Sequence, residues 1–531
     1  MSSNALYPNV FFGGGWATDF GPTVPGLRPD DNGNMILPFL WEAEDCLFEL
    51  DGGPHTMPGT ARLNSSALDT GGTRIKALYD YWTQGVGGSP TQRRVLFVGT
   101  AVYGDAANGT FSSLKTGLTA DAVPHMSQFD DILILANDNS ANVPMSYDGT
   151  TFQDLAGSPP NFSFSVKHRN WHWAAGVDAA PSTLYYSDQL NPELWTGGAS
   201  GSISIDPNDG DRITGLVSHK GELWVFKGPY KGSIHRISGS SNSTWARTTF
   251  AEGVGAVWQN SIFKFRDDIG FLWSDGSIRS LAATEAYGDF SESSMTVPIQ
   301  RYLNNSLNFT RLRHAWAVTD SSGRRTIVLL PVNGSSQNNV GISIDFRFTP
   351  PRFSKLPSLN YACAANVIDS AASNRPQIFL GGHDGYVEKW GQSTRARPAS
   401  TVLNYKVTTP YLDFGVPHRT KTLAGIGINM MPKNTDNIDT RWRRDGQTVQ
   451  SMNIAQGGQA VLGGTSGFVL DTDMLADDRF LIRWGDAETG GEFRQIQFEF
   501  RNSTLNSDTE IHSFTPIVEP GGVSTENTYG G

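Results

Sequence analysis

The feature that most constrains this chain is a repeated pairing of an apolar strand with a glycine-containing turn. Arg94–Gly99 is followed by Asn108-Gly109, Ile132–Leu135 by Asp148-Gly149, and similar pairs continue to about residue 395. A residue followed by Gly between alternating strands is typical of a hairpin, because type I′ turns need positive φ angles. The turn landmarks lie at 108, 148, 188, 231 and 275, at spacings of 40, 40, 43 and 44.

A period of roughly 40–50 residues with several strands in each repeat predicts a propeller-like multi-blade domain. We expect this domain over residues 36–398, and a large sandwich with evenly spaced strands is the alternative. The composition also favours an all-β chain, since Gly is 58 of 531 residues and charged residues are only 18%. Helical bundles need long runs of Ala, Glu, Lys and Leu instead.

The composition shifts again near Arg395–Pro398, and longer strands follow. In Phe493–Phe500, Ile496, Phe498 and Phe500 share one face of a strand with a two-residue period. The sequence therefore predicts a separate C-terminal antiparallel β-sandwich over 399–518, and then a flexible tail over 519–531.

Residues 1–35 are rich in turns, and we interpret them as an extended N-terminal arm with little core of its own. A floppy terminus is one interpretation. The other is an arm that docks on a neighbouring subunit, because Phe11, Phe12, Trp16 and Phe20 are costly to leave in water.

The charge balance argues against a sequence-reading nucleic-acid binder, since 52 acidic against 41 basic residues give a net charge of −11. Cys46 and Cys363 lie far apart, which fits two buried reduced thiols from a protein made in a cytoplasm. The first residues have no signal-peptide pattern. No apolar run approaches the ~18–20 residues of a membrane span, so no stable membrane insertion is expected.

Two motifs suggest metal binding at first sight. Asp206–Asp211 resembles a calcium loop, but position 6 is Asp211 instead of Gly and position 12 is Val217 instead of Glu. We therefore predict a structural turn. His168 and His172 are four residues apart, and the flanking residues indicate strands. On one strand these side chains would lie ~13 Å apart, too far for one zinc ion, so packed aromatics are expected.

The sequence contains no complete catalytic motif. Ser146–Phe152 resembles the Asp-box turn of sialidase-type propellers but lacks the residue between Asp and Gly, so we interpret it as a turn. A glycosidase needs two carboxylates that face each other across a cleft, and nothing in the sequence pairs the available acids. We expect no catalytic residue, no cofactor and no metal ligand, and predict that the chain is not an enzyme. The acids considered are Glu42, Glu44, Glu193, Glu222 and Asp345.

Several segments together resemble the tail nozzle proteins of short-tailed bacteriophages, also called tail tubular protein B. The best-matching part covers about 180–280, and Thr409–Gly415 fits the same family more loosely. The matching segments are Leu184–Asp188, Asn191–Trp195, Gly201–Ile205, Asp209–Leu216, Leu223–Lys227 and Phe271–Ile278.

This resemblance implies a structural virion protein at the distal end of a short tail. The chain would form a homohexameric ring below a ring of adaptor proteins, with tail fibres or spikes attached around it. Genome DNA would pass through the channel during ejection, without sequence-specific binding. The implied location is the virion tail, assembled in the host cytoplasm. A net acidic wall suits this role, because each neutralised phosphate would add affinity and slow sliding.

Two other function classes remain open from the sequence. One is a propeller enzyme that degrades glycans, which would need acids converging in a pocket. The other is a receptor-binding tail spike or adhesin. Spikes are usually trimeric, so the oligomeric state separates a six-fold nozzle ring from a three-fold needle.

Overall fold

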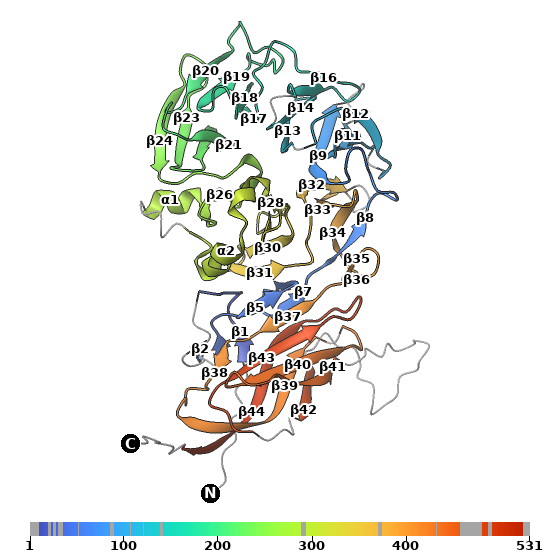
Figure 1. Cartoon of the computed structure of the whole chain (residues 1–531), viewed down its shortest axis with the longest axis vertical. Helices are drawn as coiled ribbons and strands as arrows, with labels where there is room; N and C mark the ends of the chain where they lie inside the picture. The colour runs from blue at the N-terminus through green and yellow to red at the C-terminus, as the bar shows by residue number, and fades with distance from the viewer. Residues whose placement is uncertain are drawn as a thin grey trace. The chain divides into compact units, whose positions relative to one another are not determined.

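The chain divides into two compact units in the computed structural model (Figure 1). Unit 1 combines residues 1–60, 342–358 and 392–531, and unit 2 combines 61–341 and 359–391. All of unit 2 lies inside the range predicted for the propeller-like domain. The structure describes residues 10–19, 23–24, 28–29, 35–50, 52–84, 90–106, 108–120, 122–138, 142–287, 294–369, 374–431, 433–456, 481–486 and 491–523.

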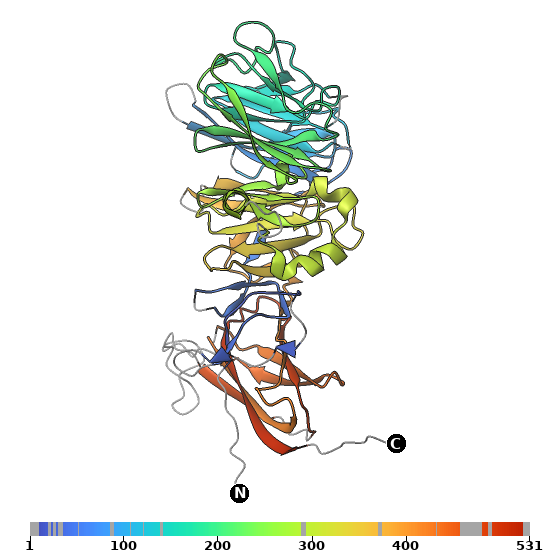
Figure 2. The same ribbon diagram turned by 90° about the vertical axis from the view of Figure 1, so that its left-hand side faces the viewer.

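Nearly all regular structure in the described residues is β-strand, which confirms the all-β prediction. One short helical segment is η2 (Val297–Ile299), which continues into α2 (Gln300–Ser306). The sequence reading missed α1 (Leu281–Tyr287), although its Leu-Ala-Ala start favours a helix. Both α-helices lie on the same side of unit 2, as two views of the ribbon show (Figure 2).

Unit 2 consists of successive antiparallel meanders, named here sheets 1 to 7 in chain order. Sheet 1 holds β9 (Ile75–Gln84), β10 (Pro90–Val98), β11 (Ala101–Gly104) and β12 (Ser112–Lys115). Sheet 2 holds β13 (Pro124–Phe129), β14 (Ile132–Asn137), β15 (Met145–Tyr147) and β16 (Phe152–Asp154). Sheet 3 holds β17 (Phe164–His168), β18 (Trp171–Ala175), β19 (Thr183–Tyr186) and β20 (Gly201–Ser204).

The remaining sheets follow the same order. Sheet 4 holds β21 (Arg212–His219), β22 (Glu222–Gly228), β23 (Ser233–Ser238) and β24 (Ala246–Glu252). Sheet 5 holds β25 (Ile262–Phe265), β26 (Asp268–Leu272) and β27 (Ile278–Ser280). Sheet 6 is the part of a longer sheet that belongs to unit 2 and contains β28 (Trp316–Thr319) and β29 (Arg325–Leu330). Sheet 7 holds β32 (Cys363–Asp369), β33 (Arg375–Gly381), β34 (Val387–Gln392) and β8 (Gly59–Arg62).

The sheets of unit 2 close into a ring (Figure 1). The first strands of neighbouring sheets contact one another around it, sheets 4 and 5 being joined through η1 (Gln259–Ser261), and β32 contacts β9. The last sheet is completed by β8, which precedes the first sheet in the chain. Repeated meanders that close in this way are the pattern of a propeller-like fold.

The predicted period is confirmed, but the landmarks did not mark equivalent turns. The first strands begin at 75, 124, 164, 212, 262, 316 and 363, at spacings of 49, 40, 48, 50, 54 and 47. Landmarks 108, 148 and 188 lie between third and fourth strands, whereas 231 and 275 lie between second and third strands. The same residue types favour turns at both positions, so the sequence alone did not reveal that the last two landmarks lie one hairpin earlier in their sheets.

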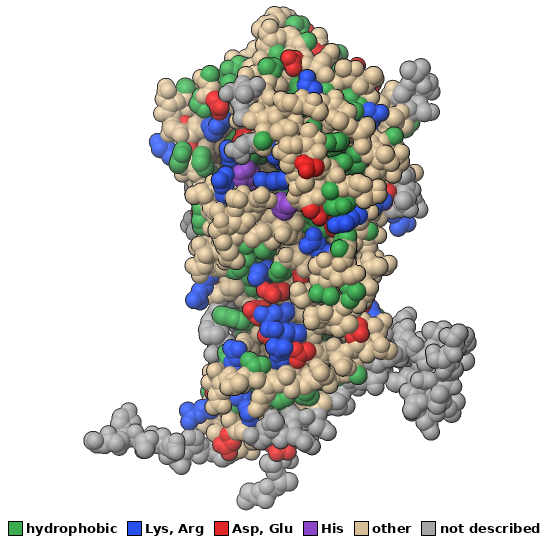
Figure 3. Space-filling model, turned by 45° about the vertical axis from the view of Figure 1, so that its right-hand side comes forward, with side chains coloured by type: hydrophobic (Ala, Val, Ile, Leu, Met, Phe, Trp, Pro, Cys, Tyr) green, Lys and Arg blue, Asp and Glu red, His purple; other side chains and the backbone are tan. Residues whose placement is uncertain are grey.

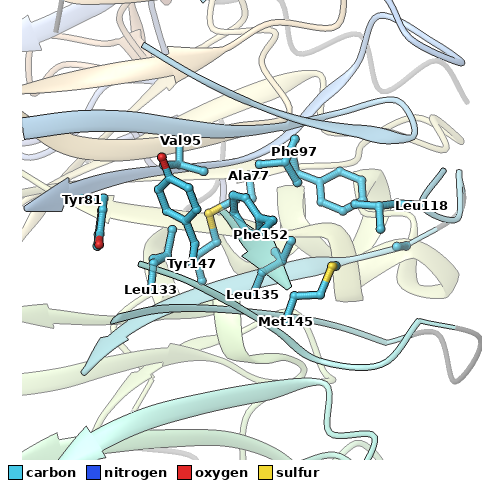
Figure 4. Packing of buried hydrophobic residues seen from close by; sticks show 13 residues of the cluster. Ala77, Tyr81, Val95, Phe97, Leu118, Leu133, Leu135, Met145, Tyr147 and Phe152 are labelled. Atoms are coloured by element: carbon cyan, nitrogen blue, oxygen red, sulfur yellow. The ribbon is translucent and has the colours of Figure 1, made fainter. Parts of the chain in front are cut away.

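Apolar side chains fill the spaces between neighbouring sheets. Between sheets 1 and 2, residues of β9 and β10 face residues of β14, β15 and β16 (Figure 4). The ring of Tyr147 stacks on Phe152 with centroids 4.5 Å apart and lies 5.4 Å from the ring of Tyr81. Similar clusters lie between sheets 2 and 3, between sheets 3 and 4 and between sheets 4 and 5, and one joins sheet 7 to sheet 1. The ring therefore has a distributed core without a single centre.

Polar contacts tie every neighbouring pair of sheets in the ring. Lys167 pairs with Asp130 across sheets 3 and 2, and Asn366 donates to the Thr319 carbonyl across sheets 7 and 6. The other ties are Gln84 N to Asp131 Oδ1 at 2.9 Å, His168 Nδ1 to Ser218 Oγ at 2.8 Å, His219 Nε2 to Asp267 O at 3.1 Å, Arg266 N to Gly323 O at 3.0 Å and Ile368 N to Asp80 Oδ2 at 2.9 Å.

Unit 1 contains two larger sheets that join distant parts of the chain. One has the order β3 (Arg28–Pro29), β4 (Met35–Leu37), β1 (Val10–Phe12), β44 (Ile511–Val523), β39 (Arg419–Met430) and β42 (Leu481–Asp486). The other has the order β2 (Thr23–Val24), β38 (Tyr411–Leu412), β43 (Ile496–Asn502), β37 (Tyr405–Thr408), β5 (Glu42–Glu44), β31 (Arg352–Leu356) and β30 (Val340–Asp345) within unit 1. In addition, β40 (Asn437–Arg444) pairs with β43, and β41 (Gln450–Ala455) pairs with β40.

Aromatic rings bring strands of these two sheets together. The ring of Phe514 in β44 lies 5.3 Å from Phe498 and 5.2 Å from Phe500 in β43. It also lies 5.9 Å from Phe12 in β1. Ile496, Phe498 and Phe500 are all fully buried, which confirms the apolar face predicted for this strand.

The N-terminal segment belongs to the core of unit 1. β1 pairs in parallel with β4 and antiparallel with β44. Phe12 and Trp16 are buried within this chain, so the need to cover them does not call for a neighbouring subunit. Phe20, which was part of the same prediction, lies outside the described residues. At the other end, 519–523 belong to β44, and the rest of the predicted tail, 524–531, lies outside the described residues.

Both cysteines are buried free thiols, as predicted. Burial raises the pKa of Cys363 to about 12 and raises that of Cys46 well above its usual value. Among the helices that the structure describes, none has the length and hydrophobicity needed to cross a bilayer.

Candidate functional site

A cavity of about 600 Å³ opens on one face of unit 2 and is called here the face cavity. Its walls come from loops after second strands, where Asp138 and Asp178 lie, and from segments that precede or begin first strands, where Arg212 and Arg313 lie. In an antiparallel meander the end of the second strand lies beside the start of the first, so these positions lie at the same end of the strands. The lining residues are Asp138, Asp178, Pro181, Ser182, Asn208, Gly210, Asp211, Arg212, Thr214, Gly228, Pro229, Tyr230, Val257, Trp258 and Arg313.

One wall of the face cavity is an ion pair stacked on an aromatic ring. Arg212 Nη2 lies 3.0 Å from Asp178 Oδ1 and also donates to the Gly176 carbonyl at 3.0 Å. The guanidinium carbon lies 5.5 Å from the centre of the Trp258 ring. A cation over an indole face is attracted electrostatically, so Trp258 helps to hold this guanidinium in place.

A second ion pair lines the same cavity. Arg313, in η3 (Phe309–His314), places Nη1 2.9 Å from Asp138 Oδ2. The other oxygen of Asp138 accepts a hydrogen bond of 2.7 Å from the Val123 amide. The carboxylate is therefore anchored to the loop that precedes β13, while the side chain of Arg313 is 42% exposed.

A third carboxylate shapes the rim without presenting charge to the cavity. Asp211 accepts hydrogen bonds from the amides of Tyr230, Lys231 and Gly232 at 2.8, 2.9 and 2.7 Å. These bonds hold the turn between β22 and β23 in one conformation. They leave the Tyr230 side chain 79% exposed at the edge of the cavity.

The face cavity thus offers two guanidinium–carboxylate pairs and an exposed aromatic ring. Such pairs supply hydrogen-bond donors and acceptors next to each other. The described residues contain no group of three or more His, Cys, Asp and Glu side chains arranged to hold a metal ion. The arrangement is suited to binding a polar ligand of small or medium size.

The predicted turn at Asp206–Asp211 lies beside this cavity and already holds a cation, the ammonium group of Lys227. This fully buried side chain contacts Asp209 Oδ2 at 2.6 Å and the carbonyls of Ile205 and Asp206 at 2.8 Å each. Partial burial of Asp209 raises its pKa, but the hydrogen bond and charge of Lys227 outweigh this and lower it. Within the segment that suggested a calcium loop, the Asp209 carboxylate and the Asp206 carbonyl therefore bind a lysine of sheet 4.

The histidine pair does not share one strand, which corrects the geometry assumed from the sequence. A turn with a positive φ of 54° at Arg169 separates them, so His168 lies in β17 and His172 in β18. His168 bonds Ser218, and His172 contacts Ser127 Oγ at 3.4 Å. Burial lowers the pKa of His172 to about 3 and that of His168 to about 4, so both rings are neutral at pH 7.

The acids considered as catalytic candidates are spread over both units and each has its own partner. In unit 2, Glu193 accepts a bond of 2.8 Å from Ser146 Oγ, and Glu222 lies 3.6 Å from Arg236. In unit 1, Glu42 pairs with Lys406, Glu44 with Lys355 and Asp345 with Arg347.

The turn that resembled an Asp-box is a turn in the structure. Asp148 Oδ1 accepts hydrogen bonds of 2.8 Å from the amides of Thr150 and Thr151. These bonds lower the pKa of Asp148 and outweigh a smaller effect of burial, which raises it.

The sequence reading missed Asp138, Asp178 and Arg313 as members of one site. A signal was present, because Asp138 and Asp178 are 40 residues apart, which is one predicted period, and each follows a second strand. Equivalent positions in neighbouring repeats lie side by side in a closed ring. Arg313 had no such signal, since it lies in η3 outside the regular strands.

No protein-family model and no curated protein matches this chain. Solved structures similar to it include an exo-beta-1,3-galactanase from Phanerochaete chrysosporium, at 9% identity and a TM-score of 0.25, covering 86% of this chain and 100% of that one. A gluconolactonase from Xanthomonas campestris is 12% identical with a TM-score of 0.30, covering 72% and 98%. The N-terminal domain of Nup159 is 9% identical with a TM-score of 0.29, covering 66% and 98%.

The prediction that this chain is not an enzyme is contradicted by these comparisons, since two of the three similar structures are enzymes. Likenesses at this level assign neither an activity nor a substrate to the chain. The comparisons do not bear on the resemblance to tail nozzle proteins, which remains a prediction.

Proposed function

We propose that this chain is a structural subunit of the distal nozzle of a short phage tail, forming a homohexameric ring through which genome DNA is ejected. Tail adaptor proteins would contact it on one side and fibres or spikes around it. The segments that resemble the nozzle family lie mainly in sheets 3, 4 and 5 of unit 2. They include Asp211 and Lys227, which hold turns of that unit together.

The observation that carries the proposal is the closed ring of sheets with a polar tie between each neighbouring pair. A tube wall under the pressure of moving DNA must keep its shape. Ties at every interface oppose the separation of any two sheets, because opening one gap breaks packing and hydrogen bonds together. A rigid body of this kind suits repeated packing around an axis.

The charge distribution supports passage of DNA without retention. Acidic and basic side chains lie close to one another on the face shown in Figure 3. Many Arg and Lys side chains are paired with acids, such as Arg441 with Asp439 and Lys389 with Asp369. Phosphate binding grows with each free cation offered to the backbone, so paired cations and a net charge of −11 favour sliding.

We also propose that the two larger sheets of unit 1 form a β-sandwich whose core includes Phe498, Phe500 and Phe514. The aromatic contacts between β43 and β44 support this arrangement. In the nozzle, this sandwich would contribute to contacts between subunits.

The oligomeric state tests the proposed function. The purified full chain is examined by native mass spectrometry and negative-stain electron microscopy, and six-fold rings are expected. A three-fold needle would contradict the nozzle and favour a spike. In parallel, fluorescence anisotropy with a short DNA duplex at low salt is expected to show no retention, whereas tight salt-sensitive binding would contradict a conduit.

A second candidate function is recognition or cleavage of a surface glycan, and the face cavity favours it. The cavity combines paired acids and arginines with the exposed ring of Tyr230. Release of reducing ends from a capsule polysaccharide would support cleavage. Binding of the polysaccharide without release would support recognition.

A further inference from the structure

We propose that the face cavity binds a neutral sugar ring, with Tyr230 as the stacking platform and the pairs Arg212–Asp178 and Arg313–Asp138 as the hydrogen-bonding groups. The inference rests on the second candidate function and names the ligand class for it. A volume of about 600 Å³ lies in the range of ~300–1,000 Å³ that ligand pockets occupy.

The two ion pairs match the hydrogen-bonding needs of a sugar. A hydroxyl group both donates and accepts, so neighbouring hydroxyls need an acceptor and a donor side by side. Asp178 is 57% exposed and Arg212 30% exposed, so their pair keeps contact with solvent on the cavity side. Arg313 is 42% exposed and holds its carboxylate partner in place. The Arg212–Asp178 pair can therefore meet two adjacent hydroxyls without losing its own contact. Asp138 is only 6% exposed, so the second pair offers the donors of Arg313 to a further hydroxyl.

Tyr230 supplies the apolar part of the site. Its side chain is the most exposed of the large hydrophobic residues in the part of the chain that the structure describes, at 79%. Its backbone amide is hydrogen-bonded to the Asp211 carboxylate, so the side chain projects from a fixed backbone position. One face of a pyranose carries mainly C–H groups, which pack favourably on an aromatic ring. A fixed backbone under an exposed ring reduces the entropy lost on binding.

Charged ligands fit this cavity less well. An anion would meet two guanidiniums that are already paired with the carboxylates of Asp178 and Asp138. A cation would have to displace Arg212 and Arg313 from their acids, while Asp211 is already bonded to three amides. A neutral polyhydroxylated ligand avoids both costs, because it breaks no ion pair.

Binding to the purified full chain tests the inference. Laminaritriose, cellotriose and maltotriose are the neutral probes, and trigalacturonate and inorganic phosphate are the charged ones. Saturation-transfer NMR and calorimetry are expected to show one neutral trisaccharide binding with a Kd between about 10 μM and 1 mM. Neither charged probe is expected to compete with it.

Two variants locate the site. Tyr230→Ala and Asp178→Asn are each expected to weaken binding by about tenfold or more, which is about 1.4 kcal/mol. Both side chains are more than half exposed, so the fold tolerates these changes. Leu190→Ala, at a turn residue that is 66% exposed and is not part of the cavity lining, is the matched control and is expected to bind as the parent does.

The outcomes separate this inference from the function on which it rests. Neutral binding that both variants weaken supports the inference. Binding of trigalacturonate alone, or neutral binding that neither variant changes, overturns it while leaving glycan recognition in place. No binding of any saccharide probe overturns both.

Discussion

The two units of this protein build their sheets by opposite routes. In unit 2, each strand pairs with the next one in the chain, and only β8 closes the ring from a distance. In unit 1, β1 lies between β4 and β44, and β5 lies between β37 and β31, so one sheet joins both ends of the chain. Short sequence patterns predict which neighbouring strands pair, whereas they do not predict pairing between strands that are distant in the chain. Pairing of distant strands also costs more loop-closure entropy before the contacts between them form.

The largest effect is expected from the residue that joins the distant parts of unit 1. Phe514→Ala removes a fully buried ring that contacts Phe12, Phe498 and Phe500. Such a change costs about 3–5 kcal/mol. Hydrogen–deuterium exchange is expected to accelerate in β1, β39, β43 and β44, while β17 and β18 keep their protection.

Leu190→Ala is the control for this measurement, since its side chain is 66% exposed. Equal loss of protection in both units after Phe514→Ala would show that they unfold together. That result would contradict the contrast drawn between them.

Acid is expected to act on the two units with opposite signs near neutral pH. In unit 2, burial lowers the pKa of the fully buried His172 to about 3. Below pH 6.5 this side chain therefore binds a proton in the unfolded chain but stays neutral in the folded one. Unit 2 should lose about 1.4 kcal/mol per pH unit from this group, or roughly 3 kcal/mol between pH 6.5 and 4.5.

In unit 1, His55 behaves in the opposite way. Partial burial lowers its pKa, but bonds to Asp508 and Glu49 outweigh this and raise it. Its contribution is complete below pH 6.5 and is lost as the pH rises through the raised value. Glu510, whose pKa is lowered to about 2 by His512 and Lys433 despite burial, starts to lose its contribution only below about pH 4.5.

Exchange rates measured for both units between pH 8 and 4.5, corrected for intrinsic chemistry, test this contrast. Unit 2 is expected to weaken first on acidification. His172→Asn should reduce the pH dependence of unit 2 and leave that of unit 1 unchanged, while His125 and His168, whose pKa values burial lowers to about 4, maintain the remainder. A steeper acid loss in unit 1 than in unit 2 between pH 6.5 and 5 would contradict the assignment.

These contrasts also explain what the sequence could predict. The repeat in unit 2 was visible because many of its hairpins carry a Gly turn, as at Gly109 and Gly149. The alternation of Ile496, Phe498 and Phe500 was visible for the same local reason. The pairing of Val10 with Phe514 left no local sign, since either strand could pair with any open edge.

In the candidate site, too, local features were predicted from the sequence and their distant partners were not. The turn at Asp206–Asp211 was predicted as a structural turn, but its partner Lys227 lies in another strand and carries no motif. Asp138 and Asp178 both line the face cavity because each follows the second strand of its sheet, and sheets 2 and 3 are neighbours in the ring. Composition and local spacing predict elements, whereas the contents of a cavity depend on how the elements meet.

A smaller effect is expected from the buried ammonium in unit 2. Lys227→Met keeps the length of the side chain but leaves Asp209 and two carbonyls without their donor. We expect a loss of about 2 kcal/mol, since Asp209 retains some contact with water. Urea denaturation measures the loss, and Lys231→Met in the neighbouring turn, where the side chain is exposed, is the matched control. Equal midpoints for the two variants would mean that the ammonium group contributes nothing to unit 2.

The smallest effect is expected from a single tie between sheets. Asn366→Ala removes the bond to the Thr319 carbonyl across sheets 6 and 7, and the residue is exposed, so the cost should be about 0.5–1 kcal/mol. Because the apolar cluster between sheets 7 and 1 stays intact, exchange should rise in β28 and β32 and remain unchanged in β13 and β17. A rise that spreads around the whole ring would show that the ties act as one cooperative belt instead of seven separate contacts. Either pattern can be compared with unit 1, where a local change at Phe514 is expected to reach both ends of the chain because the pairing there is not local.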